Sequence, residues 1–163
     1  MKKYDESLEC SDKALGLDEN NSDNLNNKAW ALNGLKKYKE ALECSNKALA
    51  LDIATFNPFA LNNKAAALTG LKKYDEAIEC SDKALALDAN NDWTWDNKAW
   101  ALINLGRYDK ALECSNKALE LDSKSAWTWD NKSLALNGLK KYEEALACKN
   151  KALTLNQNDI PTF

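Results

Sequence analysis

Five cysteines are the residues of this chain with the most obvious potential for chemistry, and they recur at nearly regular intervals: Cys10, Cys44, Cys80, Cys114 and Cys148. Thiolates can form disulfides, bind zinc or act as nucleophiles. The chain has no histidine, so the usual partner of a zinc-binding or nucleophilic cysteine is missing. The cysteines are odd in number and no Cys-x-x-Cys pair occurs. We therefore predict that they fill small apolar packing sites.

No other pattern indicates catalysis. The sequence contains no glycine-rich phosphate loop, no serine or cysteine nucleophile beside a histidine, and no metal-binding spacing. Carboxylates are plentiful, but they are interspersed with lysines in the manner of solvated helix surfaces. The sequence predicts a protein that is not an enzyme and that uses no cofactor and no metal.

The charge balance argues against nucleic acid as the main partner. The chain has 25 acidic and 22 basic residues and a net charge of −3, which is a poor match to a polyanion. RNA binding stays open as an alternative, because paired basic residues recur at equivalent places: Lys2–Lys3, Lys36–Lys37, Lys72–Lys73 and Lys140–Lys141. No apolar run is long enough to cross a membrane, and the first residues are not typical of a secretory signal. We expect a cytoplasmic location.

A repeated sequence motif organises the whole chain. The segment "KKYKEALECSNKALALD" at 36–52 recurs with small changes, and its tyrosine marks each copy at Tyr4, Tyr38, Tyr74, Tyr108 and Tyr142. The spacings between these tyrosines are 34, 36, 34 and 34 residues. A second motif, such as "LNNKAWALNGL" at 25–35, lies between the copies. In both sequence motifs the apolar residues recur with a period near 3.6 residues, which predicts two helices per repeat.

Local signals support these helices. Ser22, Asp92 and Ser125 are suitable N-caps for the helix that opens a repeat, and Pro58 suits a first helical turn. Short turns that contain asparagine or glycine join the helices. A two-helix hairpin cannot bury its apolar faces alone, so neighbouring hairpins must stack.

The period and the repeated residues resemble those of the tetratricopeptide repeat family. The repeat that contains Trp95, Tyr108, Ala111 and Ala118 matches the family's aromatic and small positions, although lysine and alanine replace the family's leucine and glycine at Lys98 and Ala99. The resemblance implies an all-α fold, a right-handed superhelical solenoid of stacked antiparallel helix pairs, with nine helices.

The phase of the repeats divides the array. Residues 1–21 correspond to a second helix only, and full repeats are expected at 22–57, 58–91, 92–125 and 126–159. Residues 160–163 form a tail that resembles the opening of another first helix. No extra polar helix is present to cap the array, so we expect either a segment of a longer array or an end-to-end homo-oligomer.

In this family the stacked first helices line a concave groove, and binding residues generally come from one face of those helices. The resemblance therefore gives a set of candidate peptide-binding residues: Asn26, Asn27, Trp30, Asn33, Phe59, Asn62, Asn63, Trp93, Asp96, Asn97, Trp100, Trp127, Asp130 and Asn131. Leu134 and Asn137 lie on the same predicted face.

Four of these asparagines, Asn27, Asn63, Asn97 and Asn131, occupy one position in successive repeats. An amide can pair with the N–H and the C=O of an extended peptide; alternatively, these amides bridge neighbouring helices. Helical periodicity also separates the tryptophans. It predicts that Trp93 and Trp100 lie on the groove face, whereas Trp95 and Trp129 belong to the core. Recurring lysines at 28, 64, 98 and 132 are expected to bury their stems and leave their amines in water.

These observations predict a non-catalytic scaffold that binds a protein or peptide partner in the groove. Some family members grip a C-terminal carboxylate with lysine or arginine in the groove, but this chain lacks the required basic residues, so no carboxylate clamp is expected. The acidic residues of the groove favour a neutral or basic segment with apolar anchors. The alternative is a structural or self-assembling array, truncated or engineered, that oligomerises through its uncapped ends.

Overall fold

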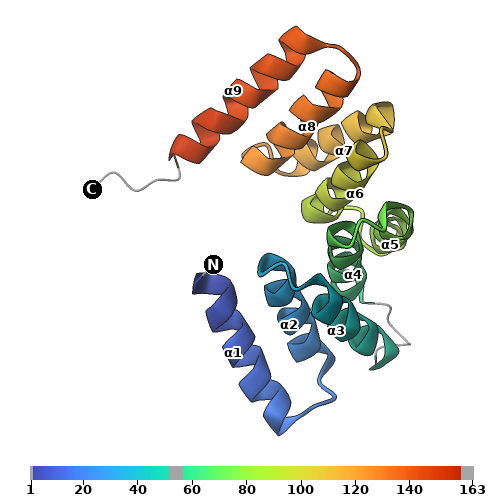
Figure 1. The fold of residues 1–163 in the computed structure, drawn as a ribbon, viewed down its shortest axis with the longest axis vertical. Helices are drawn as coiled ribbons and strands as arrows, with labels where there is room; N and C mark the ends of the chain where they lie inside the picture. Colours follow the sequence, from blue (N-terminus) through green and yellow to red (C-terminus); the bar gives the residue numbers. More distant parts are fainter. Residues whose placement is uncertain (1, 52–56, 159–163) are drawn as a thin grey trace. The chain divides into compact units, whose positions relative to one another are not determined.

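The computed structural model describes residues 2–51 and 57–158. These residues form nine α-helices and no strand (Figure 1). The helices are α1 (Lys2–Leu17), α2 (Ser22–Gly34), α3 (Tyr38–Leu51), α4 (Pro58–Gly70), α5 (Tyr74–Leu87), α6 (Asp92–Asn104), α7 (Tyr108–Leu121), α8 (Ala126–Gly138) and α9 (Tyr142–Asn158). The prediction of an all-helical stack of antiparallel pairs is thus confirmed. The predicted tail at 160–163 lies outside the described residues.

The helices belong to two compact units. The first unit holds α1–α5, and the second holds α6–α9. Within each unit, consecutive helices pack side by side, and the opening helices of adjacent repeats also touch: α2 with α4 and α6 with α8 (Figure 1). Within a unit, hairpins therefore bury their apolar faces against each other, as stacking requires.

The core consists of small and branched aliphatic side chains at repeated positions. In each full repeat one leucine of the opening helix is almost completely buried: Leu32, Leu68, Leu102 and Leu136. Alanines that face them, such as Ala41 and Ala111, are fully buried. Small residues let the helix axes approach closely, and this accounts for the alanine-rich repeat text.

The turn inside each hairpin is a Schellman motif. The amide of Lys73 donates to the carbonyl of Leu68 at 2.8 Å, and the amide of Lys72 donates to the carbonyl of Thr69 at 3.0 Å. Such a turn needs one residue with positive φ, and Lys72 has a φ of 62°. Lysine fills this left-handed position in three hairpins, whereas the α6–α7 hairpin has Gly106 there, with a φ of 71°.

Replacing Lys72 by glycine should stabilise the protein by about 1 kcal/mol, because glycine adopts positive φ without the steric penalty of a side chain. The reverse change, Gly106→Lys, should destabilise by a similar amount. Urea unfolding of both variants measures the two effects. Equal stability of Lys72→Gly and the wild type would contradict the expected strain at this turn.

The N-caps lie one residue earlier than predicted in two repeats. Asn21 caps α2 and Asn91 caps α6, each accepting a hydrogen bond from a backbone amide three residues on, so the predictions of Ser22 and Asp92 are wrong. Both positions in each pair carry a residue suited to capping, and only the first has the required extended backbone. The prediction of Ser125 is confirmed, and Pro58 stands in the first turn of α4.

A tyrosine and a glycine lock successive hairpins together. The ring of Tyr108, at the start of α7, lies so close to Gly138, at the end of α8, that a Cβ atom on the glycine would overlap it. The same relation joins Tyr38 of α3 to Gly70 of α4, and Tyr4 of α1 to Gly34 of α2. In these three places the marker tyrosine thus packs on the opening helix of the next repeat.

In the second helices α1, α3 and α7, a cysteine and the serine that follows it face in different directions. In α1, which packs only on the opening helix of the following repeat, Ser11 is buried and Cys10 is exposed. In α3 and α7, which also pack on the opening helix of their own repeat, the cysteine is buried as well. The serine therefore faces the next repeat, and the cysteine faces its own. All five cysteines are free, and burial raises the pKa of Cys44, Cys80 and Cys148.

Candidate functional site

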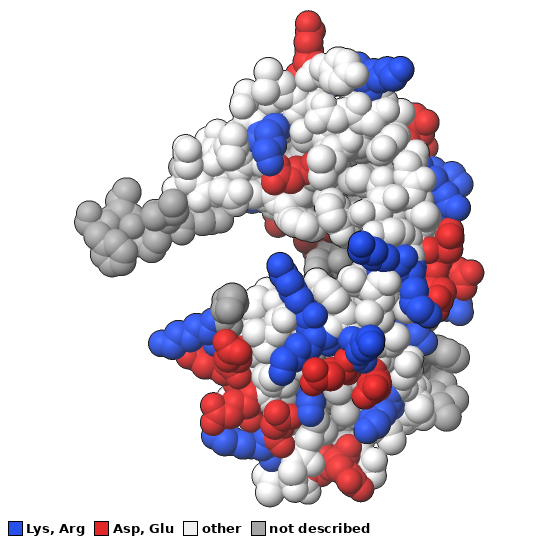
Figure 2. Space-filling model, viewed as in Figure 1, with Lys and Arg blue, Asp and Glu red and all other residues white. Residues whose placement is uncertain are grey.

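A groove of about 500 Å³ opens on the second unit, between α8 and α9. Trp100 of α6 lies at one side, and α8 and α9 supply the remaining lining residues: Trp127, Asp130, Asn131, Ser133, Leu134, Asn137, Tyr142, Ala145, Leu146 and Lys149. Over α8 and α9 the visible surface is mostly uncharged (Figure 2). The groove brings together Trp100, Trp127, Asp130 and Asn131, four of the predicted site residues.

An aromatic pair contributes to the apolar lining of this groove. The rings of Trp100 and Trp127 lie 5.6 Å apart between centroids, with an interplanar angle of 53°. This is a tilted arrangement, which is favourable for two aromatic rings. Trp127 remains 53% exposed, so much of the indole surface is available to another molecule. Leu134, Tyr142 and Leu146 extend the apolar surface and are 42%, 64% and 62% exposed.

One ion pair lies within the groove. The Nζ atom of Lys149 on α9 donates to Oδ1 of Asp130 on α8 at 2.8 Å. Both side chains are partly exposed, and such a pair contributes little to stability because water screens it. These two residues are the charged members of the groove lining, so their charges cancel.

Asp96, another predicted site residue, does not line the groove. It is buried between α6 and α8, where Thr128 donates its hydroxyl to Oδ2 at 2.6 Å and Asn131 donates its amide to Oδ1 at 3.3 Å. Burial raises the pKa of Asp96 from 3.8 to about 6. The two hydrogen bonds favour the charged form and act in the opposite direction. Asp96 thus joins two repeats.

The predicted site residues of the first unit are mostly engaged in packing. Asn63 of α4 is buried and donates its amide to the backbone carbonyl of Asn26 on α2 at 3.1 Å. Asn33 of α2 donates to the carbonyl of Asn63 at 2.9 Å. Asn26 and Asn62 are buried as well. The amides of Asn33 and Asn63 thus tie the two opening helices α2 and α4 to each other.

The remaining predicted residues of the first unit are more exposed. Asn27 and Phe59 are exposed. Trp30 is half-buried against Tyr4, with 4.9 Å between the ring centroids, and the amine of Lys3 lies 5.8 Å from the Trp30 ring.

The four asparagines that share one repeat position do not form a uniform exposed row. Asn63 and Asn131 are buried and use their amide donors between neighbouring opening helices. Asn97 is half-buried and Asn27 is exposed. The sequence left open whether these amides bind a peptide or bridge helices, and for Asn63 and Asn131 the hydrogen bonds are those of bridging.

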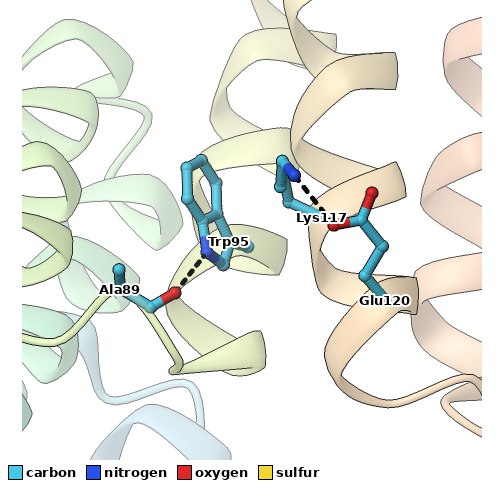
Figure 3. A network of polar contacts seen from close by, with 4 residues as sticks. All are labelled: Ala89, Trp95, Lys117 and Glu120. Carbon is cyan, nitrogen blue, oxygen red and sulfur yellow. Dashed lines mark hydrogen bonds and ion pairs between the residues drawn. The ribbon is translucent and has the colours of Figure 1, made fainter.

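The other tryptophans of the second unit have distinct surroundings. Trp95 donates its indole N–H to the carbonyl of Ala89, ahead of α6, at 3.0 Å (Figure 3). Lys117 and Glu120, an ion pair on α7, lie on the neighbouring helix. Trp129 makes the equivalent bond to Ser123 at 3.0 Å. Both rings are half-buried and not fully in the core. Through its hydrogen bond, each indole fastens the preceding turn to its helix. Trp93 is half-buried.

Two of the recurring lysines lie partly buried beside these rings. The amines of Lys98 and Lys132 are 5.5 and 5.4 Å from the ring centroids of Trp95 and Trp129. Lys28, at the same position in the first unit, pairs with Asp12 at 2.6 Å. A cation above an indole ring is held by the ring's electron density, which adds to the predicted burial of the stems.

Sequence reasoning missed the contribution of α9 to the groove. Tyr142 and Leu146 have the same types as the half-buried residues Tyr108 and Leu112 of α7, so their type alone gives no sign of exposure. A signal was nevertheless present at Lys149. Every earlier second helix has a serine at this position: Ser11, Ser45, Ser81 and Ser115.

Another hollow, of about 620 Å³, lies in the first unit between α1, α2 and α3. Its lining includes Glu19, Glu40, Glu43, Lys28 and Lys47 but no aromatic residue, so it offers no large apolar anchor point. Across the residues that the structure describes, no group of three or more potential metal ligands gathers in one place. Within the same residues, no helix has the length and apolar character needed to span a bilayer.

Comparison with known proteins is in line with this architecture. Family models described as tetratricopeptide repeat match residues 22–52, 57–124 and 128–159. No curated protein sequence shows significant similarity to the chain.

Solved structures of low sequence identity share the fold. A crystal structure of MamA is 22% identical, with a TM-score of 0.73, over 95% of this chain and 90% of that one. MamA from Desulfovibrio magneticus RS-1 is 19% identical, with a TM-score of 0.75, over 97% and 88%. YrrB, described as a TPR protein with an unusual peptide-binding site, is 23% identical, with a TM-score of 0.68, over 97% and 80%. With its five repeat copies, stacked hairpins and matching family models, the chain belongs to the tetratricopeptide repeat family.

Proposed function

We propose that this protein is a non-catalytic interaction scaffold whose second unit binds a peptide segment of a partner protein in the groove between α8 and α9. The observation that carries the proposal is the aromatic pair Trp100–Trp127 in that groove, of which Trp127 is exposed. Tryptophan is enriched among the residues that supply most of the energy of protein interfaces. Stacked helical repeats are, moreover, used widely as extended binding surfaces.

The groove chemistry indicates the kind of segment that fits. The apolar side chains around Trp127, chiefly Leu134 and Leu146, suit an apolar anchor of the partner. Asp130 and Lys149 neutralise each other, so the groove offers no surplus positive charge for a terminal carboxylate. A neutral segment with apolar anchors therefore fits best, and we propose no carboxylate clamp.

Trp127→Ala should weaken binding of such a segment at least tenfold, because it removes the most exposed apolar surface of the aromatic pair. The measurement is a screen of a peptide array, followed by titration of the best peptides against wild type and variant. Leu121→Ala is the matched control, since Leu121 is also exposed in the second unit but does not line the groove; it should bind like the wild type. Peptides that bind Trp127→Ala as tightly as the wild type, or a marked preference for acidic C-termini, would overturn the proposal.

A further inference from the structure

The face formed by α8 and α9 has an internal counterpart that is already occupied. Thirty-four residues earlier in the sequence, α6 and α7 present an equivalent face, and α8 packs on it. Each groove residue has an equivalent there: Asp130 corresponds to Asp96, Leu134 to Trp100, Tyr142 to Tyr108, and Leu146 to Leu112. The contacts that α8 makes with α6 and α7 therefore show how a helix is recognised by a face of this type.

Three residues of α8 provide the specific contacts. Thr128 and Asn131 donate hydrogen bonds to the two carboxylate oxygens of Asp96. Gly138 leaves room for the ring of Tyr108, which any side chain would overlap. In sequence, these residues form the pattern Thr-x-x-Asn-x6-Gly, with a tryptophan, Trp127, directly before the threonine.

The α8–α9 face offers the complementary groups, and among the described helices none packs upon them. Asp130 is in the place of the carboxylate, and Tyr142 is in the place of the tyrosine that receives the glycine. Tyr142 and Leu146 are 64% and 62% exposed, whereas Tyr108 and Leu112 are half-buried. Leu112 packs against the cluster of Leu136, Ala145 and Cys148. A docked helix would provide similar packing for Leu146, its equivalent in α9.

From this correspondence we propose that the α8–α9 face binds an amphipathic α-helix of a partner protein that carries the pattern Thr-x-x-Asn-x6-Gly. Its threonine and asparagine donate to Asp130, and its glycine lies against Tyr142. This inference rests on the proposed function and specifies the class of partner. A helix in a groove is a common recognition mode, and the pattern sets its orientation and register. A second copy of this chain is a poor source of the helix, because its own helix with this pattern, α8, already packs on α6 and α7.

Lys149 adjusts the affinity of this face. The serine at this position faces the next opening helix, as shown by Ser11, which is buried although α1 packs only on α2. In α9 a lysine replaces it and forms an ion pair with Asp130 at 2.8 Å. A docking helix must cover this lysine and compete with it for the carboxylate, and burying a charged amine is unfavourable. Lys149 therefore weakens the binding of a helix that would bind well to a serine at the same position.

The test uses the full chain and a synthetic peptide with the sequence of residues 125–138. A lactam bridge replaces Trp129 and Ser133 to hold the peptide helical, since a helix of this length is marginal in water. Those two residues lie on the side of α8 that contacts α9, so the bridge does not disturb the docking face. Fluorescence anisotropy of the labelled peptide measures its dissociation constant.

The expected result is saturable binding that depends on the pattern. Thr128→Val in the peptide should weaken binding roughly tenfold, because Asp130 loses a hydrogen bond from a hydroxyl. Gly138→Leu in the peptide should weaken it by at least that factor, because of overlap with Tyr142. On the protein side, Lys149→Ser should tighten binding several-fold, and Leu121→Ala should leave it unchanged. The gain expected for Lys149→Ser cannot be produced by misfolding.

Equal affinity of the three peptides, or no gain with Lys149→Ser, would overturn the inference. The peptide array separates this result from failure of the proposed function. If array peptides bind in a Trp127-dependent manner while the patterned helix does not, the groove binds peptides of another class and only the inference fails. If neither the array peptides nor the patterned helix binds, both fail.

Discussion

Asp96→Asn should stabilise the second unit at pH 7, by up to about 3 kcal/mol. The wild-type carboxylate is buried, and burial raises its pKa from 3.8 to about 6, which means that the folded state favours the protonated form. Above pH 6 the folded protein must hold a charge in this site. Asparagine has nearly the same shape without the charge; its Oδ1 can still accept from the amide of Asn131, and its Nδ2 can donate to the hydroxyl oxygen of Thr128.

The sign of the pH dependence follows from the same shift. A carboxyl group whose pKa is higher in the folded state makes stability fall as pH rises from about 4 to about 6, and leaves it constant above that range. The difference between Asp96→Asn and the wild type should therefore be large at pH 7.5 and small near pH 4. Urea unfolding followed by tryptophan fluorescence reports mainly on the second unit, which contains five of the six tryptophans.

Thr128→Val provides the control for the hydrogen bonding of this carboxylate. The variant removes the hydroxyl donor, so it should destabilise the protein more at pH 7.5 than at pH 4, where the protonated carboxyl no longer needs a charge-stabilising donor. A difference between Asp96→Asn and the wild type that is independent of pH would show that Asp96 has an ordinary pKa in the folded protein.

Gly138→Ala should destabilise the second unit by about 1–3 kcal/mol. An added Cβ atom would overlap the ring of Tyr108, and the ring cannot move without disturbing the contact between α7 and α8. This is the opposite of the usual effect, because alanine is a better helix former than glycine by about 1 kcal/mol. Unfolding in urea, with fluorescence detection, measures the change.

Gly16→Ala is the matched comparison. Gly16 also lies in a helix, α1, but a Cβ atom at this position would meet nothing within 4 Å. The same substitution should therefore stabilise there by about 1 kcal/mol. In addition, Tyr108→Leu should reduce the cost of Gly138→Ala, which a double-mutant cycle detects. If both alanine variants changed stability in the same direction, the contact between tyrosine and glycine would not be the cause.

The fold could be predicted from the sequence because the residues that determine it recur in every repeat. The tyrosines, alanines and leucines recur with one period, and each copy confirms the helical phase of the others. The N-caps were harder, since Asn21 and Ser22 are both capping residues and only the backbone conformation separates them. The lysines at positive φ were not predicted, because tertiary packing holds the turn and lysine has no preference for it.

The candidate site could be predicted only in part, because residues with the same type and repeat position have different neighbours. Asp96 and Asp130 occupy equivalent repeat positions. However, α8 covers Asp96, whereas Asp130 forms an ion pair with Lys149. Asn63 and Asn27 differ in the same way, one buried and one exposed. Periodicity indicates which face of a helix a residue occupies, but not whether another helix covers that face.

The short reach of the contacts between helices also bears on how the chain folds. Within the described residues, packed helices are neighbours in sequence or separated by a single helix, and the hydrogen bond between Asn63 and Asn26 spans only 37 residues. Little loop-closure entropy opposes such contacts, so folding should be fast for a chain of this length. Folding can also begin at any hairpin and spread to its neighbours. A local defect, such as a poorly packed Gly138 position, should slow the growth of structure there and leave initiation elsewhere unaffected.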